Sequence, residues 1–328
     1  MTILVTGATG FIGAAVARRL LAAGEEVRVL VRQDSDHRNI EGLAVTMVTG
    51  DLANPASLDR VVSECRGVYH VAADYRLWVR DPAAMYRANV DGTRALLLAA
   101  RRAGVERIVY TSSVATLGTH ADGTPADETT TATLDDMIGH YKRSKFMAEQ
   151  EVDALAADGL PVVIVNPSTP VGPGDVKPTP TGRLIVDALT GRMPAYVDTG
   201  LNIVHVDDVA DGHLLAYQRG TVGRRYVLGG DDMSLREILT ECAHIAGRPA
   251  PWLRLPHGVV LPIAYLAEGW ARMTGGTPRT TVDGVRLSRK RMYFSSARAE
   301  SELGYRSRGG RVAIRDAAGW FKANGYLQ

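Results

Sequence analysis

The chain has 328 residues, enough for one large α/β domain together with a smaller one. Hydrophobic residues make up 45% and charged residues 23%, which is ordinary for a globular protein with a sizeable core. The formal net charge of +2, without any block of like charge, argues against a nucleic-acid-binding surface and against a partner recognised by a charged tail.

We expect a cytoplasmic protein. The first apolar run starts at Ile3 and leads into a glycine-rich turn, whereas a secretory signal has a basic head and a longer apolar stretch. A proline and two charged residues interrupt the most apolar segment, 258–273, so no integral membrane segment is expected. Cys65 and Cys242 match no metal or redox spacing, which predicts two reduced thiols.

Short β-branched runs alternate with longer helical patterns in the first half of the chain. The predicted strands lie at residues 2–6, 27–31, 45–48, 68–71, 107–111 and 161–165, and the predicted helices at 11–23, 55–64, 83–103 and 137–157. Strand runs without polar alternation indicate burial on both faces, as in a parallel sheet covered by helices. We therefore predict an α/β fold, a doubly wound parallel sheet of the Rossmann type, over residues 1–166.

The rhythm changes after Val165. Residues 166–181 contain five prolines and are predicted to form a loop. The elements predicted after it are helices at 183–191, 208–217, 235–246, 259–273, 296–303 and 312–324, and strands at 203–206 and 226–228. We expect 167–202 and 229–328 to form a smaller, mostly helical, substrate-binding lobe, and 203–228 to return to the Rossmann domain.

Three glycines follow the first strand in the pattern G-x-x-G-x-x-G. Gly7 permits the tight turn, Gly10 lets the backbone approach a pyrophosphate, and Gly13 lets the following helix pack on the strand. The helix N-terminus then offers free N–H groups and a partial positive charge to the phosphates. This position at the start of a βα unit predicts a dinucleotide site.

The end of the second strand distinguishes NAD from NADP. An NAD site usually places an acid there to bind the ribose 2′-hydroxyl, but this chain has Val31 followed by Arg32. A guanidinium is suited to a 2′-phosphate, so NADP(H) is the preferred cofactor. NAD(H) stays possible because Asp34 and Asp36 lie just beyond. Asp51 follows the third strand, where its side chain can bond the adenine amino group.

Tyr141 and Lys145 form a Tyr-x-x-x-Lys pattern, and residues i and i+4 of a helix project on the same side. A lysine ammonium beside the phenol, together with the nicotinamide, favours the phenolate and makes tyrosine a usable acid–base catalyst. Ser113 ends the fifth strand, where its hydroxyl can bind the substrate oxygen. The three residues predict proton transfer coupled to hydride transfer.

Two other clusters are better explained without a ligand. His205, Asp207, Asp208, Asp211 and His213 lie within nine residues, but we interpret them as a helix start and a solvated face, not as a metal site. The basic run 289–291 is interpreted as solvated surface.

In combination these motifs resemble the extended short-chain dehydrogenase/reductase superfamily over nearly the whole chain. By this resemblance Ser113, Tyr141 and Lys145 are catalytic, and Asn89 shapes the helix beneath the active site. The resemblance implies a cofactor site lined by Gly7, Gly10, Phe11, Ile12, Gly13, Arg32, Asp51, Leu52, Ala72, Ala73, Tyr141, Lys145 and Pro167. It also implies a homodimer through the helices at 83–103 and 137–157, where Leu96, Leu97 and Leu98 form an apolar cluster.

Within the superfamily the chain looks most like the dihydroflavonol-4-reductase-like branch. Segments 166–182, 194–200 and 303–305 resemble the hopanoid-associated sugar epimerase family specifically. The acid pair that sugar-nucleotide dehydratases place after the fifth strand is replaced by residues 114–116, which disfavours dehydration.

Three functions stay open: an NADPH-dependent ketone reductase, a sugar epimerase acting by transient oxidation, and a non-catalytic NADP-sensing protein. Intact Ser113, Tyr141 and Lys145 argue against the last, and Arg32 favours the first. The substrate is expected to be a small ketone or sugar, either free or lipid-linked. An apolar stripe made of Val259, Ile263, Leu266, Trp270 and Met273 is expected to pack into the core of the lobe. The alternative is a stripe that faces the cleft or a membrane surface.

Overall fold

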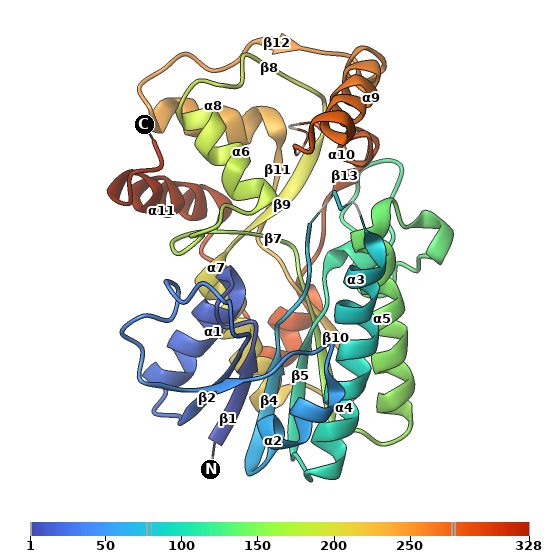
Figure 1. The fold of residues 1–328 in the computed structure, drawn as a ribbon. Helices are drawn as coiled ribbons and strands as arrows, with labels where there is room; N and C mark the ends of the chain where they lie inside the picture. Colours follow the sequence, from blue (N-terminus) through green and yellow to red (C-terminus); the bar gives the residue numbers. More distant parts are fainter. Residues whose placement is uncertain (1, 77, 80, 277, 279, 328) are drawn as a thin grey trace.

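The computed structural model describes residues 2–76, 78–79, 81–276, 278 and 280–327. Its main sheet has seven strands, all parallel, in the order β10-β6-β5-β4-β1-β2-β3 (Figure 1). Their bounds are β1 Thr2–Thr6, β2 Val27–Val31, β3 Val45–Thr49, β4 Cys65–His70, β5 Arg107–Thr111, β6 Val162–Pro167 and β10 Arg225–Leu228. The predicted doubly wound α/β fold is confirmed.

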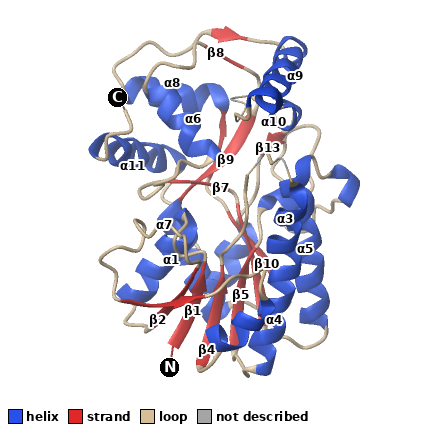
Figure 2. Cartoon of the chain, in the orientation of Figure 1, coloured by secondary structure: helices blue, strands red, loops and turns tan. Residues whose placement is uncertain are grey.

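Helices cover both faces of this sheet (Figure 2). On one face lie α1 (Phe11–Ala22) and α7 (Val206–Arg219), and on the other lie α2 (Leu58–Val62), α4 (Gly92–Arg102) and α5 (Gly139–Ala157). In β1, Ile3 and Val5 enter the first core and Leu4 the second. Burial on both faces explains why these strands are continuous apolar runs.

The helix predicted over 83–103 is three consecutive segments. A short α3 (Pro82–Tyr86) is followed by a π-helical turn, η2 (Arg87–Asp91), and then by α4. Asn89 lies in this turn with its side chain buried. Turns of this kind often occur at functional sites.

The smaller lobe is built around a second sheet in the order β11-β9-β13, with β7 also paired to β9. These strands are β7 Thr169–Val171, β9 Gly200–His205, β11 Asp231–Ser234 and β13 Arg291–Met292. The helices α6 (Pro180–Leu189), α8 (Leu235–Ile245) and α11 (Gly310–Ala323) pack around it. The short β7 contains Pro170, which hides it in a segment predicted to be a loop.

The structure divides the segment 203–228, which was expected to return to the Rossmann domain. Its later elements α7 and β10 pack there, whereas β9 pairs with strands of the second sheet. The reason is that β9 contributes Ile203 to the lobe core and Val204 to the Rossmann core, so its apolar pattern fits either sheet. Residues Ala299–Leu303, a π-helical turn (η5), pack on α7 in the Rossmann core although they were assigned to the lobe.

The apolar stripe of α9 (His257–Thr274) faces solvent, so the prediction that it packs into the core is wrong. Leu266 is 76% exposed and Trp270 68% exposed. The buried side of α9 carries Ala264 and Ala271, and the helix packs on α10 (Val282–Leu287). Small residues on that side allow the close approach of α10 that a large apolar stripe would prevent.

Two fully buried histidines bridge elements of the Rossmann domain. His70 bonds Thr6 Oγ1 at 2.8 Å and Thr93 Oγ1 at 2.9 Å, and His213 bonds Thr111 Oγ1 at 2.8 Å. Burial lowers the pKa of His70 to about 3 and that of His213 to about 4.

We expect acid to destabilise the protein through these imidazoles. The unfolded chain takes up protons below about pH 6.5 and the folded chain does not, so each histidine removes up to about 1.4 kcal/mol of unfolding free energy per pH unit. This stability is fully present above pH 6.5 and lost as the pH falls toward the folded values. Denaturant titrations across this range should show a smaller pH slope for His213→Gln and an unchanged slope for the exposed His37→Gln. Equal slopes in all three proteins would contradict the prediction.

Candidate functional site

The carboxyl ends of the seven parallel strands point toward the smaller lobe (Figure 1). Loops that follow β1, β4, β5 and β6 therefore meet between the two parts of the chain, where ligands of doubly wound folds bind. The residues predicted to bind the cofactor and to perform catalysis all lie in or next to this sheet or its loops.

The turn between β1 and α1 is shaped by its glycines. Gly7 has φ +72°, and a Cβ there would lie 2.7 Å from the Cα of Ala72, so the turn touches the loop after β4. A Cβ on Gly13 would overlap the Gly7 carbonyl group and lie 2.9 Å from the Ala8 nitrogen. Phe11 is buried at the helix start and Ile12 is half-buried.

Among the described residues, no side chain caps the free backbone N–H groups at the N-terminus of α1. The N-cap of this helix is Gly10, and no acidic residue lies in the first turn. Such an end is an anion site, and a pyrophosphate supplies the charge that it lacks. The geometry of the turn thus fits a dinucleotide.

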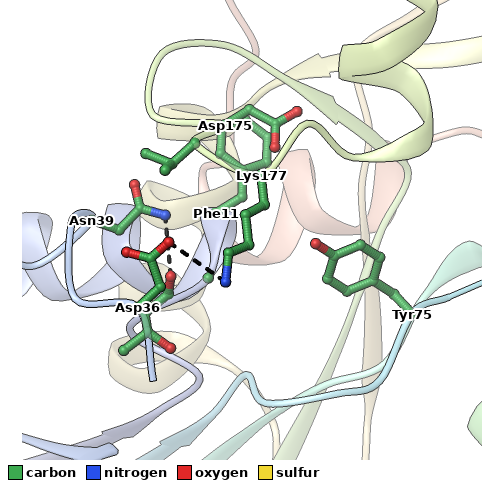
Figure 3. Close-up of a pocket in the computed structure, with 9 residues that line it drawn as sticks. Phe11, Asp36, Asn39, Tyr75, Asp175 and Lys177 are labelled. Carbon is green, nitrogen blue, oxygen red and sulfur yellow. Dashed lines mark hydrogen bonds and ion pairs between the residues drawn. The ribbon is translucent and has the colours of Figure 1, made fainter. Parts of the chain in front are cut away.

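A hollow next to this turn is closed by residues from three separate loops (Figure 3). Thr9, Gly10 and Phe11 line it, and Lys177 reaches from the lobe to within 3.5 Å of an Asp36 carboxylate oxygen. Tyr75 lies on the opposite side, and Asn39 donates its amide to the Thr9 carbonyl at 3.2 Å. Asn39, Tyr75 and Lys177 were not predicted from the sequence, because each lies in a segment without a motif.

The charged side chains after β2 differ in their partners within the protein. The Arg38 guanidinium holds the pKa of the Asp36 carboxyl well below its usual range and bonds it at 2.7 Å. Arg32 is exposed, and its backbone N–H donates to Ser35 Oγ at 3.0 Å. Asp36 is therefore paired with cations of the protein, Arg38 and Lys177, whereas Arg32 is exposed at the strand end and its charge helps to lower the pKa of Asp74.

Other predicted cofactor residues lie around the same edge. Asp51 is exposed and its carboxylate accepts the Ala53 N–H at 2.9 Å, while Leu52 packs against Gly92. Pro167 is the last residue of β6.

The loop after β4, which carries Ala72 and Ala73, is fixed by Asn89. The amide of Asn89 donates to the Asp74 carbonyl at 2.9 Å and to Ser144 Oγ at 3.0 Å, and its oxygen accepts the Asp74 N–H at 2.7 Å. The π-helical turn thereby joins this loop to α5. Asn89 is a positioning residue in this geometry.

The end of β5 and the start of α5 bring Ser113, Tyr141 and Lys145 together. Lys145 is buried, and its Nζ donates to Tyr110 Oη at 2.9 Å and to the Thr111 carbonyl at 2.8 Å. Burial raises the pKa of Tyr141, and a hydrogen bond with the Ser113 side chain opposes this rise. Burial also lowers the pKa of Lys145 to about 8.

Lys145 and the bound nicotinamide together were expected to favour the phenolate, and in the protein without cofactor the Lys145 ammonium is held by Tyr110 and Thr111. Desolvation of the phenol dominates, so Tyr141 is protonated at neutral pH. A protonated phenol is the form that can give a proton to a carbonyl oxygen.

A buried carboxylate, Glu149, lies one helical turn after Lys145. It accepts hydrogen bonds from Ser112, from Thr116 Oγ1 at 2.9 Å and from the Asn166 amide at 3.0 Å. Its other oxygen pairs with Arg225 at 3.0 Å. Glu149 opposes the lowering of the pKa of Lys145 and ties α5, β5, β6 and β10 into one unit.

Two buried oxygens at the end of β6 have no hydrogen-bond partner among the described residues. They are the side-chain amide oxygen Oδ1 of Asn166 and the hydroxyl oxygen of Ser168, on either side of Pro167. Unpartnered buried polar atoms are rare in folded proteins, and a bound ligand commonly supplies the missing partner. Together with the turn at α1, they fit a cofactor lying across this edge.

The His and Asp cluster at 205–213 is engaged within the protein. His205 bonds Asp316 at 3.2 Å and caps α7, and Asp208 pairs with Arg308 at 2.7 Å. His205, Asp208 and His213 are buried, so the interpretation of this cluster as a solvated face is wrong for these three residues. Over the residues that the structure covers, no group of three or more His, Cys, Asp or Glu could hold a metal ion.

Comparisons with known proteins show the family to which the chain belongs. The model of the NAD dependent epimerase/dehydratase family matches residues 3–229. A protein of Synechocystis sp., provisionally named a dihydroflavonol 4-reductase, is 47% identical, over 99% of this chain and 95% of its own length. Sterol demethylase protein B of Methylococcus capsulatus is 37% identical over the full length of both chains. The crystal structure of gox2253 is 51% identical, with a TM-score of 0.90 over 100% of this chain and 99% of that one. The chain belongs to the NAD dependent epimerase/dehydratase family and is an NAD(P)-dependent oxidoreductase or epimerase of the extended short-chain dehydrogenase/reductase type.

Proposed function

We propose that the protein uses NADPH to reduce a ketone on an apolar, lipid-like substrate. The observation that carries this proposal is the placement of Tyr141, at the start of α5, beside the Ser113 side chain at the carboxyl edge of the sheet. Bound there, the nicotinamide would supply the hydride.

The residues of the chain then have distinct roles. Tyr141 donates its proton to the carbonyl oxygen as that oxygen gains charge, and Ser113 orients the oxygen. Lys145 is the residue that would hold the ribose hydroxyls of the bound cofactor. Val114 and Ala115 occupy the place where a dehydratase needs acids, and both are buried. Reduction therefore fits the site better than dehydration.

The names of relatives support an apolar substrate. Besides the sterol-related protein, ceramide reductase of Caulobacter vibrioides is 30% identical over 99% of this chain. A 2-alkyl-3-oxoalkanoate reductase of Stenotrophomonas maltophilia is 31% identical over 93%. These names share long or polycyclic hydrocarbon parts next to an oxygen function. The hopanoid association stays a prediction within this class.

Purified protein incubated with NADPH and a panel of ketones tests the proposal. We expect loss of absorbance of the reduced nicotinamide and formation of a secondary alcohol from apolar ketones. UDP-sugars are the comparison, because epimerisation without net cofactor turnover is the second candidate function. An epimerised sugar with no ketone reduced would replace the proposed function by that alternative.

Arg32→Ala tests the cofactor preference. The guanidinium is free to meet a 2′-phosphate while Asp36 is held by Arg38, so the wild type should bind NADPH more tightly than NADH. Loss of one exposed charge-assisted contact should weaken NADPH binding about tenfold and leave NADH binding unchanged. Fluorescence titration measures both affinities, with Arg60→Ala as a control. Equal affinities of the wild type for the two cofactors would refute the preference.

The proposed homodimer has less support than the sequence suggested. Leu96 and Leu97 are fully buried against the sheet, so two of the three leucines that motivated it are not on the surface. Self-association through the outer faces of α4 and α5 stays a prediction.

A further inference from the structure

The outer end of the smaller lobe carries an unusual concentration of exposed apolar side chains. Eight of the eleven large hydrophobic residues that are exposed in the described part of the chain fall within 252–273. They are Trp252, Leu253, Val259, Ile263, Tyr265, Leu266, Trp270 and Met273, and we call them the α9 face. α9 and β12 (Leu253–Arg254) lie at the end of the lobe remote from the main sheet (Figure 1). Clusters of this kind mark binding surfaces, since single exposed hydrophobic residues are normally scattered.

The sequence around this face is strongly basic. Residues 248–291 contain eight Arg or Lys and two Asp or Glu, a net charge of +6 in a chain whose total is +2. Both acids in the segment are engaged: Glu268 accepts the Val282 N–H at 2.7 Å, and Asp283 lies 4.0 Å from Arg286. Asp198 faces Arg254 and Arg291 from a neighbouring loop and offsets one further charge. Arg248 and Arg289 are exposed.

We propose that the α9 face binds the surface of a lipid bilayer that contains anionic lipid. Exposed tryptophans and aliphatic residues bordered by cations are the composition of a helix lying in the membrane interface. A second copy of this chain is a poorer occupant, because two such faces would bring net positive charge against net positive charge. No helix in the described part of the chain is long and apolar enough to cross a bilayer.

The location of the face links it to the site. α9 packs on α10, and Asp283 and Arg286 of α10 line a hollow with Met137, Ile138 and Gly139. Gly139 begins α5, two residues before Tyr141. A bilayer against α9 would therefore place an apolar substrate next to this hollow. This last step rests on the proposed function, whereas binding to the bilayer does not.

Co-sedimentation of the full chain with lipid vesicles tests the proposal. We expect binding to vesicles of phosphatidylcholine mixed with phosphatidylglycerol, and much weaker binding to phosphatidylcholine alone. The double variant L266S/W270S should lower the partition coefficient at least about tenfold. R289Q should lower it about fivefold at low salt, and added salt should remove that difference. The variant M47S/V222S, which changes two exposed apolar residues outside the α9 face, is the matched control and should bind like the wild type.

Circular dichroism and the thermal midpoint should be unchanged in L266S/W270S, because both side chains are exposed. Undiminished vesicle binding by this folded variant would overturn the proposal, as would failure of the wild type to bind either vesicle. A dimer in light scattering that L266S/W270S dissociates would assign the face to a second copy instead. Reduction of a water-soluble ketone should be equal in wild type and variant. If no ketone is reduced by either, the proposed function fails while the vesicle result stands.

Discussion

Tyr141→Phe is expected to lower kcat for ketone reduction about 10²- to 10⁴-fold, the range that general acid catalysis contributes. The substitution keeps the ring and removes the one proton that the buried phenol holds next to Ser113. Cofactor affinity should change little, because the glycine turn and Lys145 are intact. Single-turnover measurements with deuterated NADPH show whether hydride transfer limits the rate.

The control for this variant is Tyr217→Phe. The Tyr217 hydroxyl accepts a hydrogen bond from Arg66 at 3.3 Å and lies against Gly67 near the start of β4. This is the amino end of the strands, whereas the site lies at their carboxyl ends. Removal of the Tyr217 hydroxyl should leave kcat unchanged. Wild-type turnover by Tyr141→Phe, under conditions where an isotope effect shows that chemistry limits the rate, would exclude Tyr141 as the proton donor.

Gly13→Ala should reduce affinity for either cofactor at least about 100-fold and lower the free energy of unfolding by about 1–3 kcal/mol. The added methyl group would overlap the Gly7 carbonyl group, so α1 must move away from the turn and its free amides leave the phosphate position. Backbone, unlike a flexible side chain, cannot move aside without disturbing the contact of Gly7 with Ala72.

Gly319→Ala is the matched control, because the same change is made in a helix where nothing lies within 4 Å of the new methyl group. It should raise the free energy of unfolding by about 0.5–1 kcal/mol, since alanine is the better helix former, and leave cofactor binding unchanged. Calorimetric titration and denaturant unfolding measure the two quantities. Normal cofactor affinity in Gly13→Ala would show that the turn does not bind the phosphates.

The parts of the site that could be predicted from the sequence are those whose residues all lie in one short segment. Gly7 to Gly13 and Tyr141 to Lys145 are each contained in one turn or one helix, so spacing alone fixes their relative geometry. Tyr75 and Lys177 line the same hollow only because two loops that are distant in the sequence converge there. No short sequence pattern predicts that convergence.

The features that were not predicted from the sequence have a common physical origin. A hydrophobic period shows which residues of α9 share a face, but not whether that face is covered, and here the small residues Ala264 and Ala271 face inward. The sheet that β9 joins could not be predicted from its sequence, because its two faces contribute to two cores. Burial raises the pKa of Tyr141 in the protein without cofactor, and this contribution could not be predicted because the Tyr-x-x-x-Lys pattern does not contain the surrounding fold.

The ion pair between Glu149 and Arg225 has a consequence for the order in which the chain folds. Glu149 lies in the catalytic helix, and Arg225 lies in β10, the last strand of the main sheet to be synthesised. Until β10 docks, the nascent chain holds a carboxylate at a position that is 4% exposed in the finished protein, without its cation. Burying an unpaired charge is costly, so we expect α5 to pack fully only once β10 is in place. The catalytic helix then depends on a contact between residues 76 positions apart.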